Sequence, residues 1–527
     1  MTTSAYARIA RPMVVVPAAF VGVFAAWPAL VTLRRGGNIT NALTSDALRS
    51  TVWFTTWQAA LSTMITLAVG LPTAWLLSRN EFRGRRIVRA LTLVPFVLPT
   101  VVIGLAFRAL LPGDLHTGTV ALVVAHVFLN VAVVVRIVGA RWEAQSYFLD
   151  EAASTLGARP MARFATVTWP MIRGSVAAAG GLVFMYCFST YGAARVLAGP
   201  SNPVVETEIY RFAVLAGDMR AASALAVAQI IVVSIVLALT SRGSNVQSTP
   251  SSPRGLTQFP RSRRVAVRVG IGATIVVFLT PLVGLVMRSL RVGDEVSFSA
   301  WRTAFGNSPV STNSVTANLV PAAWATLSTA FIAMLFAVVV GVTIAFVRVN
   351  STSRLVRVVA TTCEIVPVVV SAVVVGLGII LAFRSGAFDW RGKWWLLPVA
   401  HAVVGLPLVS RSVASALRQI PDDLRNAAAT LGAAPLHVVH TIDIGLLRRP
   451  IAAAAALAAL VSVGEFGASS LLTRRGSETL TMTIGRLLGR PGDLVQAQVF
   501  VVATVLGLLC LALVTFVDLS ATGGRDS

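Results

Sequence analysis

Long runs of apolar residues, separated by short polar segments, follow one another along the whole chain. A run of about 20 apolar residues is long enough to cross the hydrocarbon layer of a membrane as a helix. We therefore predict an all-α membrane protein with about twelve spans, at residues 12–33, 51–77, 91–112, 119–137, 174–195, 221–241, 269–289, 322–346, 358–383, 395–413, 450–472 and 497–518. The first run lacks a clear small-residue cleavage site, so we interpret it as an uncleaved helix.

The composition agrees with this class. Hydrophobic residues make up 56% of the chain and charged residues 12%, whereas soluble domains have about 25% charged residues. The net charge of +23 would suggest a nucleic-acid partner in a soluble protein, but the arginines stand in short loops between spans, so we expect none. Each of the three cysteines, Cys187, Cys363 and Cys510, falls inside an apolar run and is interpreted as a small core residue.

The arginine clusters predict the orientation of the chain. Short cytoplasmic loops collect Lys and Arg, so we place both termini on the cytoplasmic side of the plasma membrane. The clusters that favour this orientation are Arg79, Arg83, Arg85, Arg86 and Arg89, and Arg254, Arg261, Arg263, Arg264 and Arg268. Arg34, Arg35 and the arginines between 474 and 490 go against the rule.

The two halves of the chain repeat one another. Matched residues at offsets of 271 or 272 are Trp53 and Trp324, Gly70 and Gly341, and Gly104 and Gly376. Duplication explains such matches, and six spans in each copy give both copies the same direction across the membrane. We predict a first repeat over 1–241, a Ser/Gly/Pro-rich cytoplasmic linker over 242–268 and a second repeat over 269–527.

One polar segment in each half has the same pattern. Glu151-Ala-Ala-Ser-Thr-Leu-Gly157, in loop 141–172, matches Asn426-Ala-Ala-Ala-Thr-Leu-Gly432, in loop 414–449. Each segment predicts a short helix, one over 148–156 and one starting at Pro421, with acidic residues in its first turn and a glycine at a left-handed C-cap.

The alanines of these helices give each one a face with almost no side chain, which permits close approach of a partner. They are Ala152 and Ala153 in the first copy, and Ala427, Ala428 and Ala429 in the second. A capped interfacial helix without a partner is the alternative, although the presence of two matching copies favours a docking role.

At these residues the chain resembles the permease subunits of type I ATP-binding-cassette importers, whose cytoplasmic signature is Glu-Ala-Ala, a glycine and a later apolar-Pro pair. The first copy has Glu151, Gly157 and Trp169-Pro170, whereas the second has Asn426 and lacks the proline. The resemblance implies that each loop is a coupling helix seated in a cytoplasmic ATPase homodimer. The missing carboxylate at Asn426 leaves open whether both ATPase copies are gripped equally. It also implies an external solute-binding protein, with lipid around the spans.

The fused twelve-helix arrangement is similar to the ferric-iron and thiamine permease branch. The segments that carry this similarity are 125–130, 206–211, 464–468 and 486–492. The resemblance implies import of ferric iron or thiamine, and sulfate, molybdate and polyamine permeases stay open as more distant relatives.

No residue pattern predicts catalysis. The GxxxxGK[ST] phosphate-binding loop is absent, and the only lysine, Lys393, stands in an unrelated Arg-Gly-Lys-Trp-Trp segment. We therefore expect no enzyme activity, with ATP hydrolysis on a separate subunit. His126 and His401 occupy matching spans without clustered Asp, Glu or Cys, so we expect no cofactor, metal site or catalytic triad. His437 and His440 are interpreted as part of a solvated loop face.

Two acidic residues, Glu364 and Glu465, fall within predicted spans, apart from Asp518 at the end of the last one. An ionisable group in the membrane is costly, which makes both residues candidates for the translocation path. Glu465 is preferred because glycines flank it, and its counterparts in the first half are Thr190 and the adjacent Tyr191. The alternatives are a structural hydrogen bond for Glu465 and an interfacial position for Glu364.

Two further classes of function stay open. A secondary transporter of the major facilitator type also has twelve spans in two parallel halves. Such a transporter would carry several intramembrane charges for ion coupling and no capped alanine helix in each half, so the pattern favours the importer permease. A non-transporting membrane scaffold is the third class.

Overall fold

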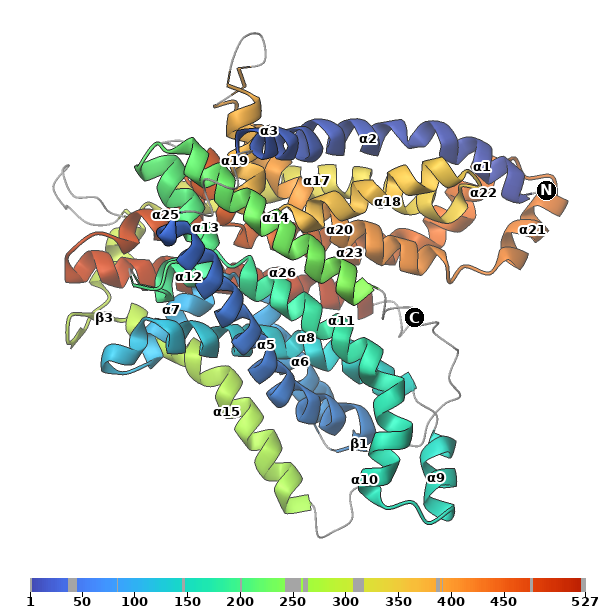
Figure 1. Cartoon of the computed structure of the whole chain (residues 1–527), viewed down its shortest axis with the longest axis horizontal. Coiled ribbons are helices and arrows are strands. Elements are labelled where there is room, and N and C mark those ends of the chain that lie inside the picture. Colours follow the sequence, from blue (N-terminus) through green and yellow to red (C-terminus); the bar gives the residue numbers. More distant parts are fainter. Residues whose placement is uncertain are drawn as a thin grey trace. The chain divides into compact units, whose positions relative to one another are not determined.

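Helices account for nearly all of the described structure, which is a computed structural model (Figure 1). It describes residues 2–36, 45–82, 84–144, 147–199, 201–241, 257–258, 264–306, 317–384, 389–390, 392–473 and 477–522. The strands within these ranges form two short pairs, β1 (Asn80–Glu81) with β2 (Thr257–Gln258), and β3 (Arg291–Val292) with β4 (Glu295–Val296). The predicted all-α class is confirmed.

The chain divides into two compact units. The first-repeat unit comprises Thr44–Thr207 and Ile231–Arg288, and the second-repeat unit comprises Met1–Leu43, Glu208–Ile230 and Ser289–Ser527. The N-terminal helices therefore belong with the second repeat, whereas α15 (Arg264–Ser289) belongs almost entirely with the first. Most of the predicted linker 242–268 lies outside the described residues.

The first-repeat unit is built on the long helices α5 and α8, which pack against each other and against α11. Besides α15, its elements are α5 (Asp46–Arg79), α6 (Arg85–Val97), α7 (Thr100–Leu110), η2 (Gly113–His116), α8 (Thr119–Ala144), α9 (Tyr147–Thr155), α10 (Pro160–Arg163), η3 (Phe164–Thr168), α11 (Trp169–Phe188) and α12 (Gly192–Leu197). Two helices, α13 (Val205–Tyr210) and α14 (Met219–Ser241), cross the boundary between the units.

The second-repeat unit repeats this plan, with α17, α20 and α23 packed together and the N-terminal helices lying along α17 and α18 (Figure 1). Its elements are α1 (Thr2–Met13), α2 (Val15–Val21), η1 (Gly22–Ala26), α3 (Trp27–Arg35), η4 (Arg211–Leu215), α16 (Ser299–Ala304), α17 (Leu319–Asn350), α18 (Arg354–Val369), α19 (Ala372–Ala382), α20 (Leu396–Leu417), α21 (Asp422–Thr430), α22 (Pro435–Val438), η7 (Val439–Ile444), α23 (Gly445–Gly464), α24 (Gly467–Leu472), α25 (Leu480–Leu488) and α26 (Asp493–Thr522).

Matching contacts inside the two units confirm the predicted repeat. The N–H of Val205 donates to Thr55 Oγ1 at 3.0 Å, and the N–H of Leu480 donates to Thr326 Oγ1 at 2.9 Å. The matched glycines on α5 and α17 also have matching neighbours. A Cβ added to Gly70 or to Gly341 would lie 2.8 Å from the Cβ of a valine, Val134 or Val409 respectively. These glycines allow α5 to pack closely on α8, and α17 on α20.

Several of the predicted spans are not continuous helices. The span predicted over 358–383 is the pair α18 and α19, bent by 103°. Val370 is extended between them, and Ser371 caps α19 by accepting the N–H of Val374 at 3.3 Å. The span predicted over 91–112 is likewise split into α6 and α7 at Leu98 and Pro99, because a residue before proline avoids the helical conformation.

Ten helices in the described residues are long and apolar enough to cross a membrane, or eleven if the bent pair counts as one span. The predicted spans 174–195 and 450–472 include breaks of the same kind near their ends. The first breaks between α11 and α12, and the second between α23 and α24. Each repeat therefore contains an interrupted helix at the same place.

Candidate coupling helices and translocation site

Both predicted loop helices are present, as α9 and α21, and both end at the predicted glycine. Gly157 has φ +79° and Gly432 has φ +84°, in the left-handed region that favours glycine. The hydrogen bonds that close the two helices also match. Ala158 N–H donates to the Ala153 carbonyl, and Ala433 N–H donates to the Ala428 carbonyl, each at 3.0 Å. This is the Schellman pattern, which satisfies the last carbonyls of a helix.

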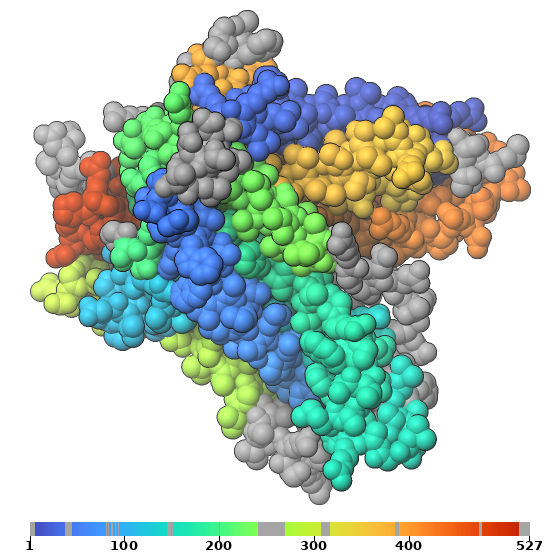
Figure 2. Space-filling view, in the orientation of Figure 1, coloured from blue at the N-terminus to red at the C-terminus, as the bar shows by residue number. Residues whose placement is uncertain are grey.

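The predicted docking residues lie on the surface of their units. Glu151, Ala152 and Gly157 are exposed and Ala153 is half-buried, and in the second copy Asn426, Ala427 and Gly432 are exposed and Ala428 is half-buried. In the space-filling view, the α9–α10 segment (teal) and the α21–α22 segment (orange) each stand at an end of their own unit (Figure 2).

Exposed apolar side chains that were not among the predicted site residues lie beside them. Leu156 is 87% exposed and its counterpart Leu431 is 88% exposed. Met161 and its counterpart Leu436 are also exposed. The shared Thr-Leu-Gly sequence was the signal that could have identified the leucines. An exposed apolar side chain at the same place in both copies is typical of a docking surface.

The second loop contains a buried ion pair. The Nε of Arg425, on α21, donates to Asp443 Oδ1 at 2.9 Å, and its Nη1 donates to Asp422 Oδ1 at 3.0 Å. The Arg425 and Asp443 side chains are almost fully buried. Burial acts to lower the pKa of Arg425, but its hydrogen bond to Asp443 and that residue's charge outweigh burial and raise the pKa above its ordinary value.

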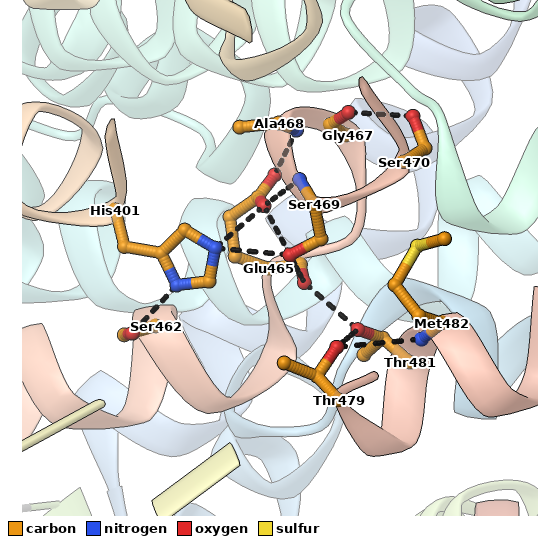
Figure 3. Close-up of polar contacts among 10 residues, drawn as sticks. All are labelled: His401, Ser462, Glu465, Gly467, Ala468, Ser469, Ser470, Thr479, Thr481 and Met482. Carbon is orange, nitrogen blue, oxygen red and sulfur yellow. Dashed lines mark hydrogen bonds and ion pairs between the residues drawn. The ribbon is translucent and has the colours of Figure 1, made fainter. Parts of the chain in front are cut away.

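Glu465 lies at the break between α23 and α24, where its carboxylate begins the second helix (Figure 3). Its Oε1 accepts the N–H of Ala468 at 2.9 Å, and its Oε2 accepts the N–H of Ser469 at 3.0 Å. Free N–H groups at a helix start favour a carboxylate, both by hydrogen bonding and through the helix dipole. Glu465 is only 7% exposed.

A histidine of α20 completes this cluster. His401 Nε2 lies 2.9 Å from Ser469 Oγ and 3.2 Å from Glu465 Oε2, and its Nδ1 shares a hydrogen bond of 2.7 Å with Ser462 Oγ (Figure 3). The histidine thus bridges the end of α23 and the start of α24. In the sequence, His401 is visible only as the match of His126.

At the corresponding place in the first half, a threonine stands where the second half has Glu465. Thr190 and Tyr191 are buried between α11 and α12. His126 Nδ1 lies 3.4 Å from Ser62 Oγ, within the same unit. The two interrupted helices therefore differ at this position, where the acid of the second half has a threonine as its counterpart.

Glu364 of α18 is buried among polar side chains of two other helices, α17 and α20. Its carboxylate accepts hydrogen bonds from Arg348 of α17 and from two residues of α20, Ser410 at 2.6 Å and Arg411 at 3.2 Å. The structure does not bring Glu364 into contact with the Glu465 cluster. Two basic side chains around one buried carboxylate compensate for the cost of burying its charge.

The described residues contain no group of three or more His, Cys, Asp or Glu that could hold a metal ion. His437 and His440 are exposed on α22 and η7.

The protein family that this chain matches is found twice along it, once in each repeat. The family described as binding-protein-dependent transport system inner membrane component matches the chain twice, over residues 66–245 and 335–523. The chain is 25% identical to the thiamine transport system permease protein ThiP of Brucella abortus (strain 2308) over 498 residues, which cover 90% of this chain and 88% of that protein. The corresponding protein of Haemophilus influenzae is 24% identical, with 90% and 89% covered.

A third relative matches one half only. It is the putative 2-aminoethylphosphonate transport system permease protein PhnV of Salmonella typhimurium, 29% identical over 256 residues, which are 48% of this chain and 93% of that protein. Because the family matches both repeats and most of the chain, this protein belongs to the family of binding-protein-dependent transport system inner membrane components.

Proposed function

We propose that this chain forms the membrane path by which an ATP-driven importer takes up thiamine. As a family member it is a transport subunit and not an enzyme, and it works with an external binding protein and a separate ATPase. The observation that supports this solute is the match to two thiamine permeases, which align over 90% of this chain and over 88% and 89% of their own lengths. Nothing observed favours a major facilitator transporter or ferric iron as the solute.

The two loop helices are proposed to couple the path to the ATPase. Coupling would involve Glu151, Ala152, Ala153 and Gly157 of the first copy, and Asn426, Ala427, Ala428 and Gly432 of the second. Support comes from the matched exposure of Leu156 and Leu431 and from the identical Schellman ends. Two loops of one shape fit a pair of identical ATPase subunits.

The translocation path is proposed to run beside the interrupted helices. Discontinuous helices at corresponding places in two repeats are a common way to build a transport site, because they leave polar backbone and helix ends available. Glu465, Thr190 and Tyr191 all lie at such breaks and are buried, so their contact with solute requires a different conformation. Glu364, held by arginines, is proposed as a more distant part of the path.

We also propose that both termini are cytoplasmic and that lipid surrounds the membrane-spanning helices. Helix α1 packs against α21 and α22, which puts the N-terminus on the same side as the second loop helix. The matched tryptophans Trp53 and Trp324 are 69% and 74% exposed, as expected of side chains that face lipid. We further propose the repeat boundaries 1–241 and 269–527, with the linker 242–268 in the cytoplasm.

Copurification tests the coupling part of the proposal. An affinity-tagged chain, expressed together with its ATPase and binding protein, should retain the ATPase in mild detergent. Replacing Leu156 and Leu431 together with aspartate should release it, because charges then replace the apolar contacts. Retention of the ATPase by that double variant would contradict docking at these loops.

A further inference from the structure

The ion pair between Arg425 and Asp443 joins the two arms of the second loop. Arg425 lies on α21, and Asp443 lies in η7, which leads directly into α23. The pair therefore connects the loop helix to the start of a membrane-crossing helix. Arg425 also bonds to Asp422 at the start of α21, so one guanidinium fixes the helix start and its approach to α23.

The N-terminal helix covers this pair. Helix α1 packs against α21 and α22, and its residues Tyr6, Ala7 and Ala10 are buried there. The Arg425 guanidinium lies 5.6 Å from the centre of the Tyr6 ring, and Tyr6 stacks on Phe346 of α17. Figure 1 shows α1 beside α21 and α22 in this unit. The covering helix excludes water from the pair, which strengthens its electrostatic attraction.

The first loop cannot form the same pair at the matching positions. At the same repeat offset, Arg425 and Asp443 correspond to Asp150 and Thr168. An acid and a hydroxyl cannot form a charged pair. The half that keeps the carboxylate Glu151 thus lacks the internal pair, and the half with Asn426 at that place has it.

The pair is also an inefficient source of stability. Arg425 Nη2 and Asp443 Oδ2 are buried without a hydrogen-bond partner among the described residues. Buried ion pairs seldom stabilise a fold more than apolar side chains of the same size, since removing charges from water is costly. A defined position for α21 is a benefit that apolar side chains would not supply.

We infer that the Arg425–Asp443 pair, covered by α1, positions the second coupling helix, so that movement of the ATPase reaches α23 although position 426 carries no carboxylate. The inference rests on the proposed coupling role of α21. In this arrangement the first coupling helix is positioned by the contact of Glu151 with the ATPase. The second coupling helix is positioned by contacts within this chain.

The main test removes the pair without leaving a buried charge. The double variant Arg425→Met/Asp443→Leu is reconstituted with the ATPase and the binding protein. We expect normal amounts of complex in the membrane, with thiamine transported per ATP hydrolysed lowered about tenfold, within the usual range of coupling between sites. The swapped variant Arg425→Asp/Asp443→Arg should recover part of the loss. Full coupling in the apolar double variant would overturn the inference, because the pair would then be only structural.

A second measurement needs no variant. In the ATPase-free permease, the backbone amides of α21 should exchange with deuterium more slowly than those of α9, because α21 has the covered Arg425–Asp443 pair. Equal or faster exchange in α21 would overturn the inference even if the variants fail to assemble.

The variant Gly432→Val separates this inference from the proposal on which it rests. If Gly432→Val leaves coupling intact, α21 is not a coupling helix and the proposed function fails at this loop. If Gly432→Val uncouples transport and Arg425→Met/Asp443→Leu does not, only the positioning role fails.

Discussion

The Nε2 atom of His401 lies 3.2 Å from Oε2 of Glu465, so a histidine of α20 contacts the carboxylate that begins α24. This contact ties together three helices at the break between α23 and α24. The matching break in the first repeat has Thr190 in place of the acid. The two halves of the proposed path therefore share an interrupted helix but differ in the residue that begins its second part.

Glu465→Gln should lower both stability and transport. The carboxylate accepts two backbone N–H groups, and an amide offers only one oxygen, so one buried donor loses its partner at a cost of about 1–3 kcal/mol. We expect a lower melting temperature of the purified complex and reduced uptake. Thr190→Val in the first half is the matched control, with a smaller effect on both. An unchanged melting temperature for Glu465→Gln would show that the carboxylate does not hold α24.

Glu465→Cys tests whether the path passes this residue. Because Glu465 is buried here, the introduced thiol should be unreactive toward a water-soluble reagent in one nucleotide state and reactive in the other. The native cysteines Cys187, Cys363 and Cys510 are buried, which limits background labelling. A thiol that stays unreactive in both the ATP-free and the ATP-bound complex would assign Glu465 to the packed interior.

Gly157→Val and Gly432→Val should each uncouple ATP hydrolysis from transport while the protein still inserts. A Cβ in the left-handed conformation costs about 1–2 kcal/mol, and relief of that strain would misdirect the loop helix. Gly445→Val is the control, because Gly445 is helical and has open space around it. Binding-protein-stimulated ATPase activity of reconstituted complexes gives the readout, and normal stimulation in Gly157→Val would count against coupling at α9.

Glu151→Gln should weaken ATPase association more than Asn426→Ala. A carboxylate can pair with a basic residue of the partner, whereas an amide offers only neutral hydrogen bonds. Both side chains belong to exposed residues, so neither change disturbs a core. Equal loss of the ATPase from the two variants in a pull-down would contradict the proposed asymmetry.

Gly70→Ala and Gly341→Ala should destabilise their units by similar amounts. The added Cβ would lie 2.8 Å from a valine Cβ in both cases, and overpacking of this kind costs about 1–3 kcal/mol. Val134→Gly, which removes the valine Cβ and its methyl groups, should recover part of the loss in Gly70→Ala. Gly272→Ala, which meets nothing within 4 Å, should not lower the melting temperature. If Val134→Gly recovers none of the loss, the contact between these two residues is not the source of the strain.

Local patterns in the sequence predicted much of this structure. The spans, the repeat and the ends of α9 and α21 followed from apolar run length, residue matching and the conformational preference of glycine. The helix breaks were missed because a run of apolar residues looks the same whether it is straight or bent by 103°. Pro99 was the available signal for the first break.

The polar contacts at the candidate sites could not be predicted in the same way. His401 and Glu465 are far apart in the chain, and Tyr6 meets Arg425 only after α1 packs on the second repeat. Such pairs depend on tertiary packing, which no local pattern contains. The sequence did identify Glu465 and its counterpart Thr190, since an acid in an apolar run is conspicuous.

ATP-driven uptake of labelled thiamine into proteoliposomes is the most direct test of the central claim. The vesicles would contain this chain with its ATPase, the binding protein would be outside, and ATP would be enclosed. The account predicts accumulation of thiamine that requires ATP and the binding protein, and that is lost in Gly157→Val. Uptake that proceeds without ATP, or a competent complex that transports another solute and excludes thiamine, would contradict it.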